Sequence, residues 1–474
     1  MLYLDRIRMC DYPQLVITEI RTKLKKLGRV YDRLLEIKGE RQLFLVGGAL
    51  RDIALGHNPA DFDFAVSGSG IDFAQKLAPV IRGKLIVLSE KDDEARVVYR
   101  KKITLDFNGL GPQPIESDLA RRDFTVNALA CELPDIPAVI DPFGGMEDIK
   151  RKLIRPVSGQ SLHLDPLRLL RAFRIAQELG FTVHPQVLEQ GKTITLKATA
   201  AERIGAEFIR ILETPNSWRW VETLNQIQRL EEIMPELAPL LKDEELRIHT
   251  FRTCQKIEEL LANPGFFARL EPEWQAYFSN FPCRRALLKL SGLLHDLAKP
   301  HTRFTTETGE VHFYGHDSLG AKLTTKICHI RLRLSREQTR MVRTLVKEHM
   351  RLHLLATAPE LTERAIRRYF RDLGEEALGL MILCYADGWA TAGKTAHLET
   401  TITRMINQHR SELARTRVKR LVTGNDLIAL GMTPGPVFRV ILQELEDLQI
   451  EGKIKTKEEG LEYLKAYLMR EAEK

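Results

Sequence analysis

The hydrophobic and polar positions divide the chain into regions with different periodicity. Residues 12–37 carry apolar residues at helical spacing and predict one amphipathic helix. Between residues 42 and 133, short apolar runs are separated by turn segments such as SGSG at 67–70. These runs predict strands with the sequences LFLV, DFDFAV, KLIVL, ARVVYR and ITLDF.

From about residue 160 onward, nearly every segment shows the helical period, and strand signals are few. The sequence therefore predicts an α+β protein. A small α/β domain forms the N-terminal third, and a helical body follows that divides near residues 215–245.

Length and composition are those of a globular protein with several domains. The chain has 474 residues, of which 44% are hydrophobic and 28% are charged. No apolar run approaches the roughly 20 residues that cross a bilayer, and the N-terminus lacks the layout of a signal peptide. Six cysteines are scattered without CxxC spacing. We expect a reduced, cytoplasmic protein without a membrane partner.

The net charge of +7 and the pI near 9.0 allow a polyanionic partner but do not require one. Basic residues gather in two segments, 331–351 and 404–420. Runs of this kind are more often solvated helix faces than binding sites. They become informative only together with a catalytic motif.

The segment LVGGALRDIALGHNPADFDFAV at 45–66 combines a glycine turn with two carboxylates. In a strand, Asp61 and Asp63 lie on one face, about 7 Å apart, and repel each other unless a cation lies between them. Mg²⁺ prefers such oxygen ligands, and substrate phosphates can complete its coordination shell. A third carboxylate, Asp106 in ITLDFN, lies on a later predicted strand and could reach the same metals.

The glycine turn points to the same chemistry. Gly47 and Gly48 let backbone N–H groups approach phosphate oxygens, and Arg51 adds a cation just beyond them. A DxD sequence alone is more often a surface feature without a ligand. Together with the turn, Arg51 and the third acid, it indicates two-metal phosphoryl transfer, in which one ion activates a hydroxyl and the other supports the leaving pyrophosphate.

Five ordered blocks of sequence resemble a known family. They are GGALRDIALG with DFDF at 47–64, DLARRDFTVNALA at 118–130, IDPFGGMEDIKRKLIRPV at 140–157, DPLRLLRAFRIAQELGF at 165–181 and AERIGAEFIRIL at 201–212. Across roughly residues 40–215, the chain resembles class II tRNA nucleotidyltransferases and bacterial poly(A) polymerases, within the polymerase-β-like superfamily. The resemblance implies a nucleotidyltransferase head followed by an all-α neck.

The resemblance also implies roles at the matching positions. Metal-binding acids would be supplied by DFDF, triphosphate contacts by the glycine turn, ribose contacts by RRDFTVNA, and base reading by DPLRLLRAFR. The implied residues are Asp61 and Asp63 as catalytic acids, and Gly48, Arg51, Arg122, Asp123, Asp165, Arg168, Arg171 and Arg174 as nucleotide-binding residues. The residue patterns described above add Asp106 to the catalytic acids and Gly47 to the nucleotide-binding residues. Asp61 and Asp63 would bind Mg²⁺.

The base-reading role of Asp165 can be compared with the chemistry of the bases. Asp165 followed by Pro166 is a good helix N-cap, so capping is the alternative role. Capping does not explain Arg168, Arg171 and Arg174, which recur along one side of the predicted helix. Cytosine and adenine present an amino donor beside a ring-nitrogen acceptor, which a carboxylate and a guanidinium complement. Uracil and guanine present the reverse, so the pair is expected to select C and A without a template.

One position departs from the family pattern. An acidic residue usually precedes this aspartate, and here it is Leu164. The switch between CTP and ATP is therefore left open, and an enzyme that adds only C or only A is an alternative.

A second constellation begins at SGLLHDLAKPHT, residues 291–302, which resembles the core of HD-domain phosphohydrolases. The implied metal ligands are His249, His295, Asp296 and Asp387, with His316 and His349 as additional candidates. Imidazole and carboxylate ligands suit Mn²⁺, Ni²⁺ or Zn²⁺ better than Mg²⁺. Attack of a metal-bound hydroxide on a phosphoester would be the chemistry.

The leading prediction is a template-independent nucleotidyltransferase that adds C and A, from CTP and ATP, to the 3′ end of tRNA or another RNA. Alternatives of the same class are a poly(A) polymerase and a C-only or A-only enzyme. Alternatives of other classes are a protein that acts mainly as an HD phosphohydrolase and a non-catalytic RNA-binding module. The intact block from Gly47 to Asp63 argues against the first of these, and the intact acidic triad of Asp61, Asp63 and Asp106 argues against the second. No protein partner can be inferred.

The expected division of the chain follows from these motifs. It comprises an N-terminal helix at 1–39, a nucleotidyltransferase head at 40–157, a helical neck at 158–240, an HD domain at 241–395 and a helical tail at 396–474.

Overall fold

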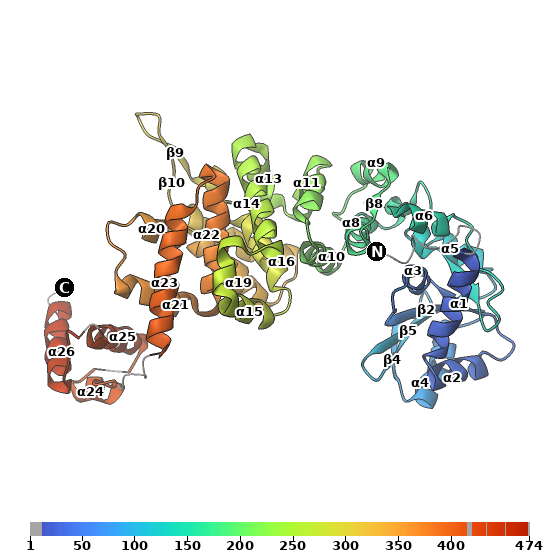
Figure 1. Cartoon of the computed structure of the whole chain (residues 1–474), viewed down its shortest axis with the longest axis horizontal. Helices are drawn as coiled ribbons and strands as arrows, with labels where there is room; N and C mark the ends of the chain where they lie inside the picture. The colour runs from blue at the N-terminus through green and yellow to red at the C-terminus, as the bar shows by residue number, and fades with distance from the viewer. Residues whose placement is uncertain (1–11, 415–419, 433, 451, 473–474) are drawn as a thin grey trace. The chain divides into compact units, whose positions relative to one another are not determined.

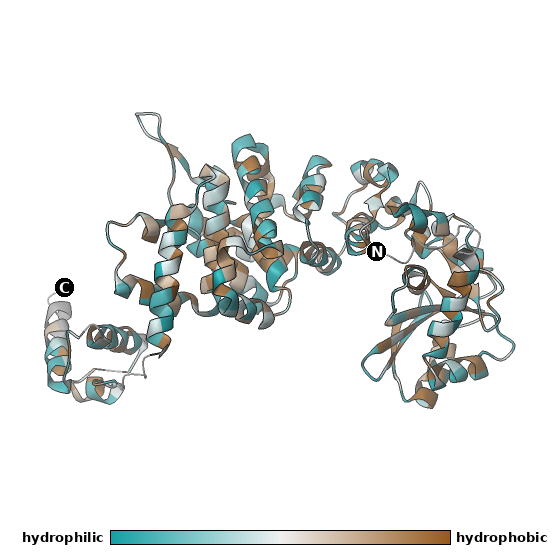
Figure 2. Cartoon of the chain, in the orientation of Figure 1, coloured by the Kyte–Doolittle hydropathy of each residue, from teal (hydrophilic) through white to brown (hydrophobic). Residues whose placement is uncertain are grey.

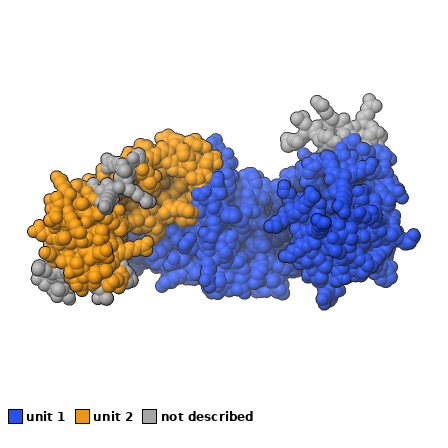
Figure 3. Space-filling model, turned by 90° about the horizontal axis from the view of Figure 1, so that it is seen from below, with its two compact units in different colours: residues 1–265, 278–347 blue, residues 266–277, 348–474 orange. Residues whose placement is uncertain are grey.

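The computed structural model describes residues 12–414, 420–432, 434–450 and 452–472. The chain forms two compact units (Figure 3): residues 1–265 with 278–347, and residues 266–277 with 348–474. The first unit contains the predicted α/β region and the first helices of the body. The predicted division into five domains stays a prediction.

The N-terminal α/β region is built on a six-stranded sheet with the order β3-β4-β5-β2-β1-β6 (Figure 1). Its strands are β1 (Leu43–Val46), β2 (Asp61–Val66), β3 (Lys84–Ser89), β4 (Glu94–Tyr99), β5 (Ile103–Gly109) and β6 (Ala130–Glu132). The five predicted strand runs are confirmed, and β6 is an addition. β2 and β5 run parallel, whereas the other neighbours are antiparallel.

Aromatic residues form the core between the sheet and helix α4 (Gly70–Ile81). Phe107 of β5 lies 5.3 Å from Phe64 of β2 and 5.1 Å from Phe73 of α4, measured between ring centroids. All three rings are fully buried. Because side chains alternate along a strand, the burial of Phe64 places Asp61 and Asp63 on the opposite face of β2.

The N-terminal helix is two helices rather than the single predicted one. α1 (Tyr12–Lys25) ends before a turn, and α2 (Arg29–Lys38) begins after Gly28. Gly28 has φ 52° and ψ −126°, a conformation that only glycine adopts readily, so the helix breaks there. The periodicity of apolar residues continues across the break, which explains why the sequence pattern did not reveal it.

The helical body begins with short helices and one small strand pair. β7 (Leu153–Ile154) pairs in parallel with β8 (Thr182–Val183). Besides α1, α2 and α4, the helices of the α/β region are α3 (Gly48–Ala54), α5 (Ile115–Ala120) and α6 (Gly145–Arg151). The first helices of the body are α7 (Ser161–Leu164), α8 (Arg168–Leu179), α9 (Pro185–Thr193), α10 (Ala201–Glu213) and α11 (Trp218–Gln226). α8 packs against α10, and α10 packs against α16 (Arg284–Leu294).

Among the described residues after 226, the regular structure is helical apart from the hairpin of β9 (Arg303–Thr305) and β10 (Val311–Phe313). Its other helices are α12 (Leu230–Ile233), α13 (Ala238–Lys242), α14 (Glu244–Ala262), α15 (Glu271–Ser279), α17 (Lys299–Thr302), α18 (His316–Lys326), α19 (Arg336–Glu348), α20 (Arg351–Thr357), α21 (Glu363–Leu373), α22 (Ala377–Ala392), α23 (Ala396–Ala414), α24 (Gly424–Ala429), α25 (Pro436–Ile450) and α26 (Lys457–Ala472). The predicted fold class, an α/β head followed by a helical body, is confirmed.

The helices of the body alternate hydrophilic and hydrophobic residues (Figure 2), as expected of helices with one buried side. Within the described part of the chain, no helix combines the length and hydropathy needed to cross a membrane.

Candidate functional site

Two parallel strands bring the three predicted catalytic acids to one face of the sheet. Asp63 of β2 lies directly opposite Asp106 of β5 in the strand register, and Asp61 precedes Asp63 by two residues. Asp61 is exposed, whereas Asp63 and Asp106 are half-buried. Burial raises the pKa of Asp63 to about 6, and the charges of Asp106 and Asp61 contribute while Arg122 opposes them. This face therefore has unbalanced negative charge that a cation would stabilise.

One cation of the chain already contacts this acidic cluster. Arg96 of β4 lies opposite Asp106 in the register and binds both of its carboxylate oxygens at 2.8 Å. The hydrogen bond to Asp106 raises the pKa of Arg96, so the guanidinium stays charged. Sequence reasoning missed Arg96. Its place in the run ARVVYR was visible, but the pairing of that run with ITLDF depends on long-range strand order.

The glycine turn brings charged side chains close to the backbone. Gly47 has φ 75° and ψ −146°, and a Cβ atom there would lie 2.7 Å from both Asp63 Oδ2 and Arg122 Nη1. The N–H of Gly47 donates to the carbonyl of Leu129 at 3.2 Å. A side chain at position 47 would therefore displace Asp63 and Arg122, so glycine is needed at this position.

The motif RRDFTVNA is a hydrogen-bonded network next to the acids. Arg122 donates to Asp118, and Arg51 of α3 donates to Asn127 at 2.6 Å. Asn127 in turn donates to Asp123 at 3.0 Å. Asp118 and Asn127 are site residues that the sequence prediction left out, although both lie in the quoted block. The network couples helix α3, which follows the glycine turn, to the RRDFTVNA motif.

Asp123 is buried and is paired with an arginine of the next motif. Arg171 of α8 binds Asp123 Oδ2 through two nitrogens, at 2.9 and 2.7 Å. Burial by itself raises the pKa of Asp123, but Arg171 and the hydrogen bonds from Asn127 and Phe124 outweigh it and lower the pKa below its ordinary value. Asp123 therefore holds Arg171 at the boundary between the sheet region and the helical body.

Asp165 is not the N-cap of the following helix, contrary to the alternative role considered for it. α8 begins at Arg168, and its N-cap is Leu167 without a side-chain cap. Asp165 Oδ1 accepts from the N–H of Leu167 at 3.2 Å, and Oδ2 accepts from Arg203 at 2.8 Å. Pro166 keeps these residues in a turn, so the helix starts two residues later than the sequence pattern indicates.

The three predicted arginines of α8 have different environments. Arg168 donates to the backbone carbonyls of Arg121 and Arg122 and to Ser161, which fixes its guanidinium beside the RRDFTVNA motif. Arg174 is buried and donates to Glu207 of α10 and to Glu178, both at 2.7 Å. Arg174 thus links α8 to α10, whereas Arg168 and Arg171 face the site.

A pocket of about 410 Å³ collects these groups, a volume typical of small-molecule sites. Its lining residues are Asp63, Leu88, Asp92, Glu94, Asp106, Asn108, Asp118, Arg121, Arg122, Asp123, Asp165, Arg168, Arg171 and Arg203. Two of the predicted catalytic acids and five of the predicted nucleotide-binding residues are among them. Gly47, Gly48, Arg51, Asp61 and Arg174 are not. The exposed Leu164 also lies outside this lining.

The predicted HD motif forms a histidine-carboxylate cluster in the first unit. His295 and Asp296 are fully buried, and the Nε2 atoms of His249 and His295 lie 3.2 Å apart. Asp296 Oδ2 lies 3.2 Å from His295 Nε2 and 3.4 Å from His249 Nε2. A set of three such ligand atoms within one small space can hold a metal ion.

Backbone carbonyls orient two of these histidines. His295 Nδ1 lies 2.8 Å from the carbonyl of Gly292, and His316 Nδ1 lies 2.7 Å from that of Phe313. Donation by Nδ1 leaves each Nε2 as a lone-pair donor, the arrangement that metal-binding histidines use. His316 Nε2 is 3.7 Å from Asp296 Oδ1, so it is directed toward the same carboxylate.

Two further predicted ligands belong to the second unit. His349 is buried, and Asp387 of α22 is 2.9 Å from His353 Nε2. His353 was not among the predicted ligands.

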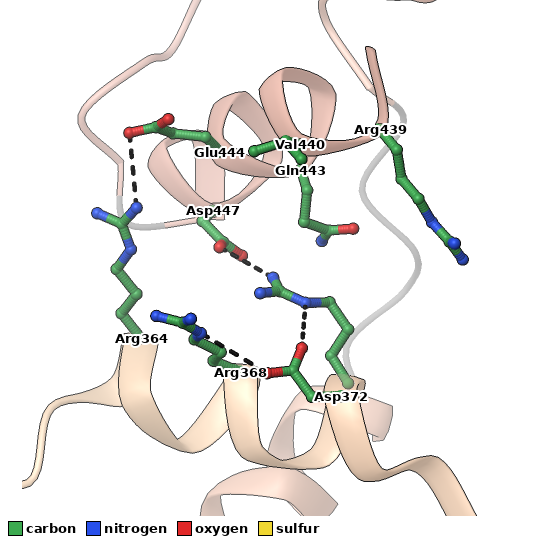
Figure 4. A pocket seen from close by; sticks show the side chains of 9 residues that line it. Arg364, Arg368, Asp372, Arg439, Val440, Gln443, Glu444 and Asp447 are labelled. Carbon is green, nitrogen blue, oxygen red and sulfur yellow. Dashed lines mark hydrogen bonds and ion pairs between the residues drawn. The ribbon is translucent and has the colours of Figure 1, made fainter. Parts of the chain in front are cut away.

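The second unit contains a pocket of about 670 Å³ between α21 and α25 (Figure 4). Its charged lining residues are Arg364, Arg368, Arg371 and Arg439, with Asp372, Glu444 and Asp447. Arg371 lies 3.2 Å from Asp447, and Arg364 lies 3.6 Å from Glu444. The acids therefore offset most of the arginine charge. The strongly amphipathic sequence ERAIRRYFRDL of α21 could have indicated this cluster before the structure was known.

Several basic residues of the two segments noted in the sequence form ion pairs in the described part of the chain. Arg331 pairs with Glu236, Arg410 with Glu273, and Arg420 with Glu446. Arg415, Arg417 and Lys419 lie outside the described residues.

Family models match three parts of the chain. A poly A polymerase head domain matches residues 43–155, and an HD domain matches residues 246–391. Residues 180–241 match a model described as "Probable RNA and SrmB- binding site of polymerase A". The first two ranges contain the acidic cluster and the histidine-carboxylate residues, respectively.

Curated relatives align along most of the chain. An A-adding tRNA nucleotidyltransferase of Deinococcus radiodurans is 32% identical, over 90% of this chain and 95% of its own. A CC-adding tRNA nucleotidyltransferase of Thermus thermophilus is 31% identical, over 90% and 93%. A multifunctional CCA protein of Stenotrophomonas maltophilia is 30% identical over 73% of this chain and 85% of its own.

Solved structures share the fold. A CCA-adding enzyme in complex with CTP has a TM-score of 0.65 at 22% identity, covering 96% of this chain and 98% of its own. A Thermotoga maritima CCA-adding enzyme in complex with tRNA has a TM-score of 0.61 at 21% identity, with 94% of each chain covered. With these relatives and family models, the chain belongs to the family of tRNA nucleotidyltransferases and bacterial poly(A) polymerases, and it carries an HD domain.

Proposed function

We propose that this protein is a template-independent nucleotidyltransferase that adds C, A or both, from CTP and ATP, to the 3′ end of tRNA. The observation that carries the proposal is the 410 Å³ pocket, because its lining joins Asp63 and Asp106 with Asp165, Arg168 and Arg171. Acids for phosphoryl transfer and a carboxylate-guanidinium set for base reading therefore share one cavity. The tRNA nucleotidyltransferase relatives support the choice of substrate.

Asp61, Asp63 and Asp106 fit a pair of Mg²⁺ ions. The raised pKa of Asp63 indicates that burial and neighbouring carboxylates leave it in need of a cation. Bound Mg²⁺ would activate the 3′ hydroxyl and stabilise the leaving pyrophosphate. The chain's own part is to hold the acids on two adjacent strands and to fix Asp106 through Arg96. Arg51, held by Asn127, would contact the triphosphate.

Base selection would depend on Asp165 and Arg168. Asp165 would accept a hydrogen bond from the amino group of cytosine or adenine, and Arg168 would donate to the ring nitrogen. The reversed pattern of uracil or guanine would leave a buried polar group unpaired, at a cost of roughly 1–3 kcal/mol. Arg171 is engaged by Asp123, and Arg203 holds Asp165 in place. Held rigidly in this way, Asp165 and Arg168 would select the incoming base as a template strand does in other polymerases.

Within the proposed function, the relatives also bear on which nucleotides the enzyme adds: C, A or both. The relatives that cover about 90% of this chain carry names for partial activities, A-adding or CC-adding. The shorter matches carry the name multifunctional CCA protein. These names favour a partial enzyme, and the absence of an acidic residue at Leu164 agrees with that alternative. A poly(A) polymerase remains the alternative with another product.

Three tRNA substrates would distinguish these activities. They end before the CCA sequence, after its first C, or after its second C, and each is incubated with CTP, ATP or both. A CCA enzyme completes all three with both nucleotides, a CC-adding enzyme extends only the first two, and an A-adding enzyme extends only the third. Long A tails would indicate a poly(A) polymerase, and absence of any extension would contradict the proposed function.

A second function is proposed for the histidine-carboxylate cluster, namely hydrolysis of a phosphomonoester or a 2′,3′-cyclic phosphate. It is supported by the convergence of His249, His295 and Asp296. A transition ion such as Mn²⁺, Ni²⁺ or Zn²⁺ would supply an activated hydroxide there. Metal analysis of the purified protein would test it, together with two assays in added Mn²⁺ or Ni²⁺: phosphate release from a phosphomonoester, and ring opening of a 2′,3′-cyclic phosphate to the monoester. Absence of both metal and hydrolysis would leave the domain without this activity.

A further inference from the structure

The β9–β10 hairpin presents three aromatic rings on one face. His312 of β10 is paired with Phe304 of β9 in the antiparallel register, and Tyr314 follows His312 by two residues. Side chains at such positions lie on the same face of a hairpin. The rings of His312 and Tyr314 are stacked with centroids 5.2 Å apart, and Phe304 lies 6.5 Å from Tyr314. Figure 1 shows the hairpin as a two-stranded arm.

This aromatic face is open to solvent. Tyr314 is 72% exposed and Phe304 is 55% exposed. Among the strongly exposed large hydrophobic side chains of the described residues, Phe304 and Tyr314 are the aromatic ones, and the others are aliphatic. Rings of the first unit such as Phe64, Phe107 and Phe173 are, by contrast, in the core. A cluster of exposed rings on a short hairpin contributes little to folding and is typical of a binding surface.

The hairpin is connected to the histidine-carboxylate cluster through Phe313. The carbonyl of Phe313 accepts from His316 Nδ1, and the Phe313 ring lies 5.5 Å from Lys299 Nζ. Lys299 Nζ is 2.6 Å from Asp296 Oδ2. Tyr314 precedes His316 by only two residues, so their Cα atoms lie within about 7 Å of each other. The aromatic face is therefore joined to the histidine-carboxylate cluster by the contacts of Phe313 and by the short segment from Tyr314 to His316.

We propose that Phe304, His312 and Tyr314 form a stacking platform for the bases of a single-stranded RNA whose 3′-terminal phosphate reaches the histidine-carboxylate cluster. This inference rests on the proposed hydrolytic function and names its substrate class. Successive bases stack on exposed aromatic rings regardless of sequence, and the short reach from Tyr314 to His316 suits a strand that ends at the cluster.

The charges on the hairpin indicate where the phosphates would pass. Lys299 and Arg303 lie at its base, whereas Glu307 and Glu310 lie in and beside its loop. Glu310 is 3.7 Å from His312 Nε2, so the loop end repels phosphate. An RNA strand would therefore cross the rings near the base of the hairpin, next to Lys299, and would avoid the tip of the hairpin.

The test compares binding of two fluorescently labelled octamers that carry a 3′ phosphate, one single-stranded RNA and one with abasic residues. Binding is measured by anisotropy in EDTA, so hydrolysis plays no part. The wild-type protein should prefer the RNA, and the double variant Phe304→Ala/Tyr314→Ala should weaken RNA binding about tenfold without changing abasic binding. The conservative variant Phe304→Tyr/Tyr314→Phe should retain the preference. Val437→Ala/Val440→Ala, at exposed positions of α25, is the matched control and should bind as wild type does.

Equal RNA binding by wild type and the double alanine variant would overturn the platform. So would an equal loss for RNA and abasic strands, because that would indicate a general effect on the fold or on charge. If the platform behaves as expected but the wild-type protein with Mn²⁺ or Ni²⁺ neither releases phosphate from a 3′-phosphate RNA nor opens a 2′,3′-cyclic phosphate to the terminal monoester, the hydrolytic function fails and the RNA-binding surface stands.

Discussion

At the scale of single residues, Gly47 controls how closely charged groups meet in the transferase site. A methyl group there would lie 2.7 Å from Asp63 Oδ2 and Arg122 Nη1, and φ is +75°. We expect Gly47→Ala to lower kcat/KM for nucleotide addition by about 100-fold, because Asp63 must shift. Gly68 has φ +87° but open space around the same atom, so Gly68→Ala is the matched control.

Thermal unfolding and steady-state kinetics of both variants separate the two effects. Each should lose about 1–2 kcal/mol of stability from backbone strain, and only Gly47→Ala should lose most of its activity. Equal activity in the two variants would mean that the close approach is not needed.

Asp63 makes the stability of the metal-free protein depend on pH. Its native pKa of about 6 lies above its ordinary value of 3.8, because burial and the neighbouring acids disfavour the charge. Between pH 6 and pH 4, the native protein therefore binds a proton that the unfolded chain does not. Stability is reduced above pH 6 and rises as pH falls through 6 toward 4.

Asp63→Asn should accordingly stabilise the protein at pH 8 in EDTA, by up to about 3 kcal/mol, with a smaller gain at pH 4.5. Urea unfolding at the two pH values measures the difference. Asp61→Asn, at an exposed position, should give a smaller gain. A loss of stability at pH 8 in Asp63→Asn would show that the carboxylate is not held under repulsion. Both variants should fail to add nucleotides.

At the scale of elements, the turn before α8 allows two possible roles of Asp165, helix capping and base reading, to be tested separately. Because Leu167, and not Asp165, occupies the N-cap position of α8, removing the Asp165 carboxylate does not remove an N-cap side chain. Asp165→Ala should reduce rejection of UTP and GTP by about tenfold, since the acceptor for the amino group is lost. Misincorporation on tRNA measures this directly.

Asp165→Ser and Arg203→Ala are the controls for this turn. Serine can still accept from the Leu167 N–H but lacks the charge, so it should also lose discrimination. Arg203→Ala keeps the Asp165 carboxylate but removes the ion pair that holds it in place, so discrimination should fall less than in Asp165→Ala. Wild-type nucleotide choice in Asp165→Ser would contradict the base-reading role.

The contact between α8 and α10 depends on a buried arginine. Arg174→Met would leave Glu207 buried without its guanidinium partner, which typically costs about 3–5 kcal/mol. We expect this loss in urea unfolding, and partial recovery in Arg174→Met/Glu207→Gln. The KM values for CTP and ATP should stay nearly unchanged. A raised KM without loss of stability would instead place Arg174 in base reading.

At the scale of the whole molecule, the acidic cluster and the histidine-carboxylate cluster should work independently. Their ligands come from separate segments of the chain and differ in chemistry: carboxylates at one, mainly imidazoles at the other. Asp61→Ala should abolish nucleotide addition and leave hydrolysis intact. His295→Ala should abolish hydrolysis and tight binding of a transition metal, and leave addition largely intact.

Both activities and the metal content can be measured on the same preparations. Loss of both activities in His295→Ala, with the fold retained in circular dichroism, would show that the two sites are coupled. Retention of addition in Asp61→Ala would remove Asp61 from the transferase centre.

The sequence by itself determined those features that depend on neighbours along the chain. Alternation in DFDFAV and ITLDF was enough to predict strands with acids on one face, because side-chain direction in a strand is a local property. The glycine turn, the HD motif and the order of the blocks were likewise readable, and they led to the family. The predicted helix at 12–37 failed at Gly28 because apolar spacing does not report a backbone dihedral.

The tertiary structure alone decided which charged groups meet. Arg96 reaches Asp106 only because β4 pairs with β5, and Asp63 faces Asp106 only because β2 lies on the other side of β5. Three arginines of similar spacing on α8 acquired different roles, since Arg174 meets Glu207 of α10 while Arg171 meets Asp123. Strand order and helix packing arise from burial of apolar surface across the whole chain, and the partners of each buried charge follow from that packing.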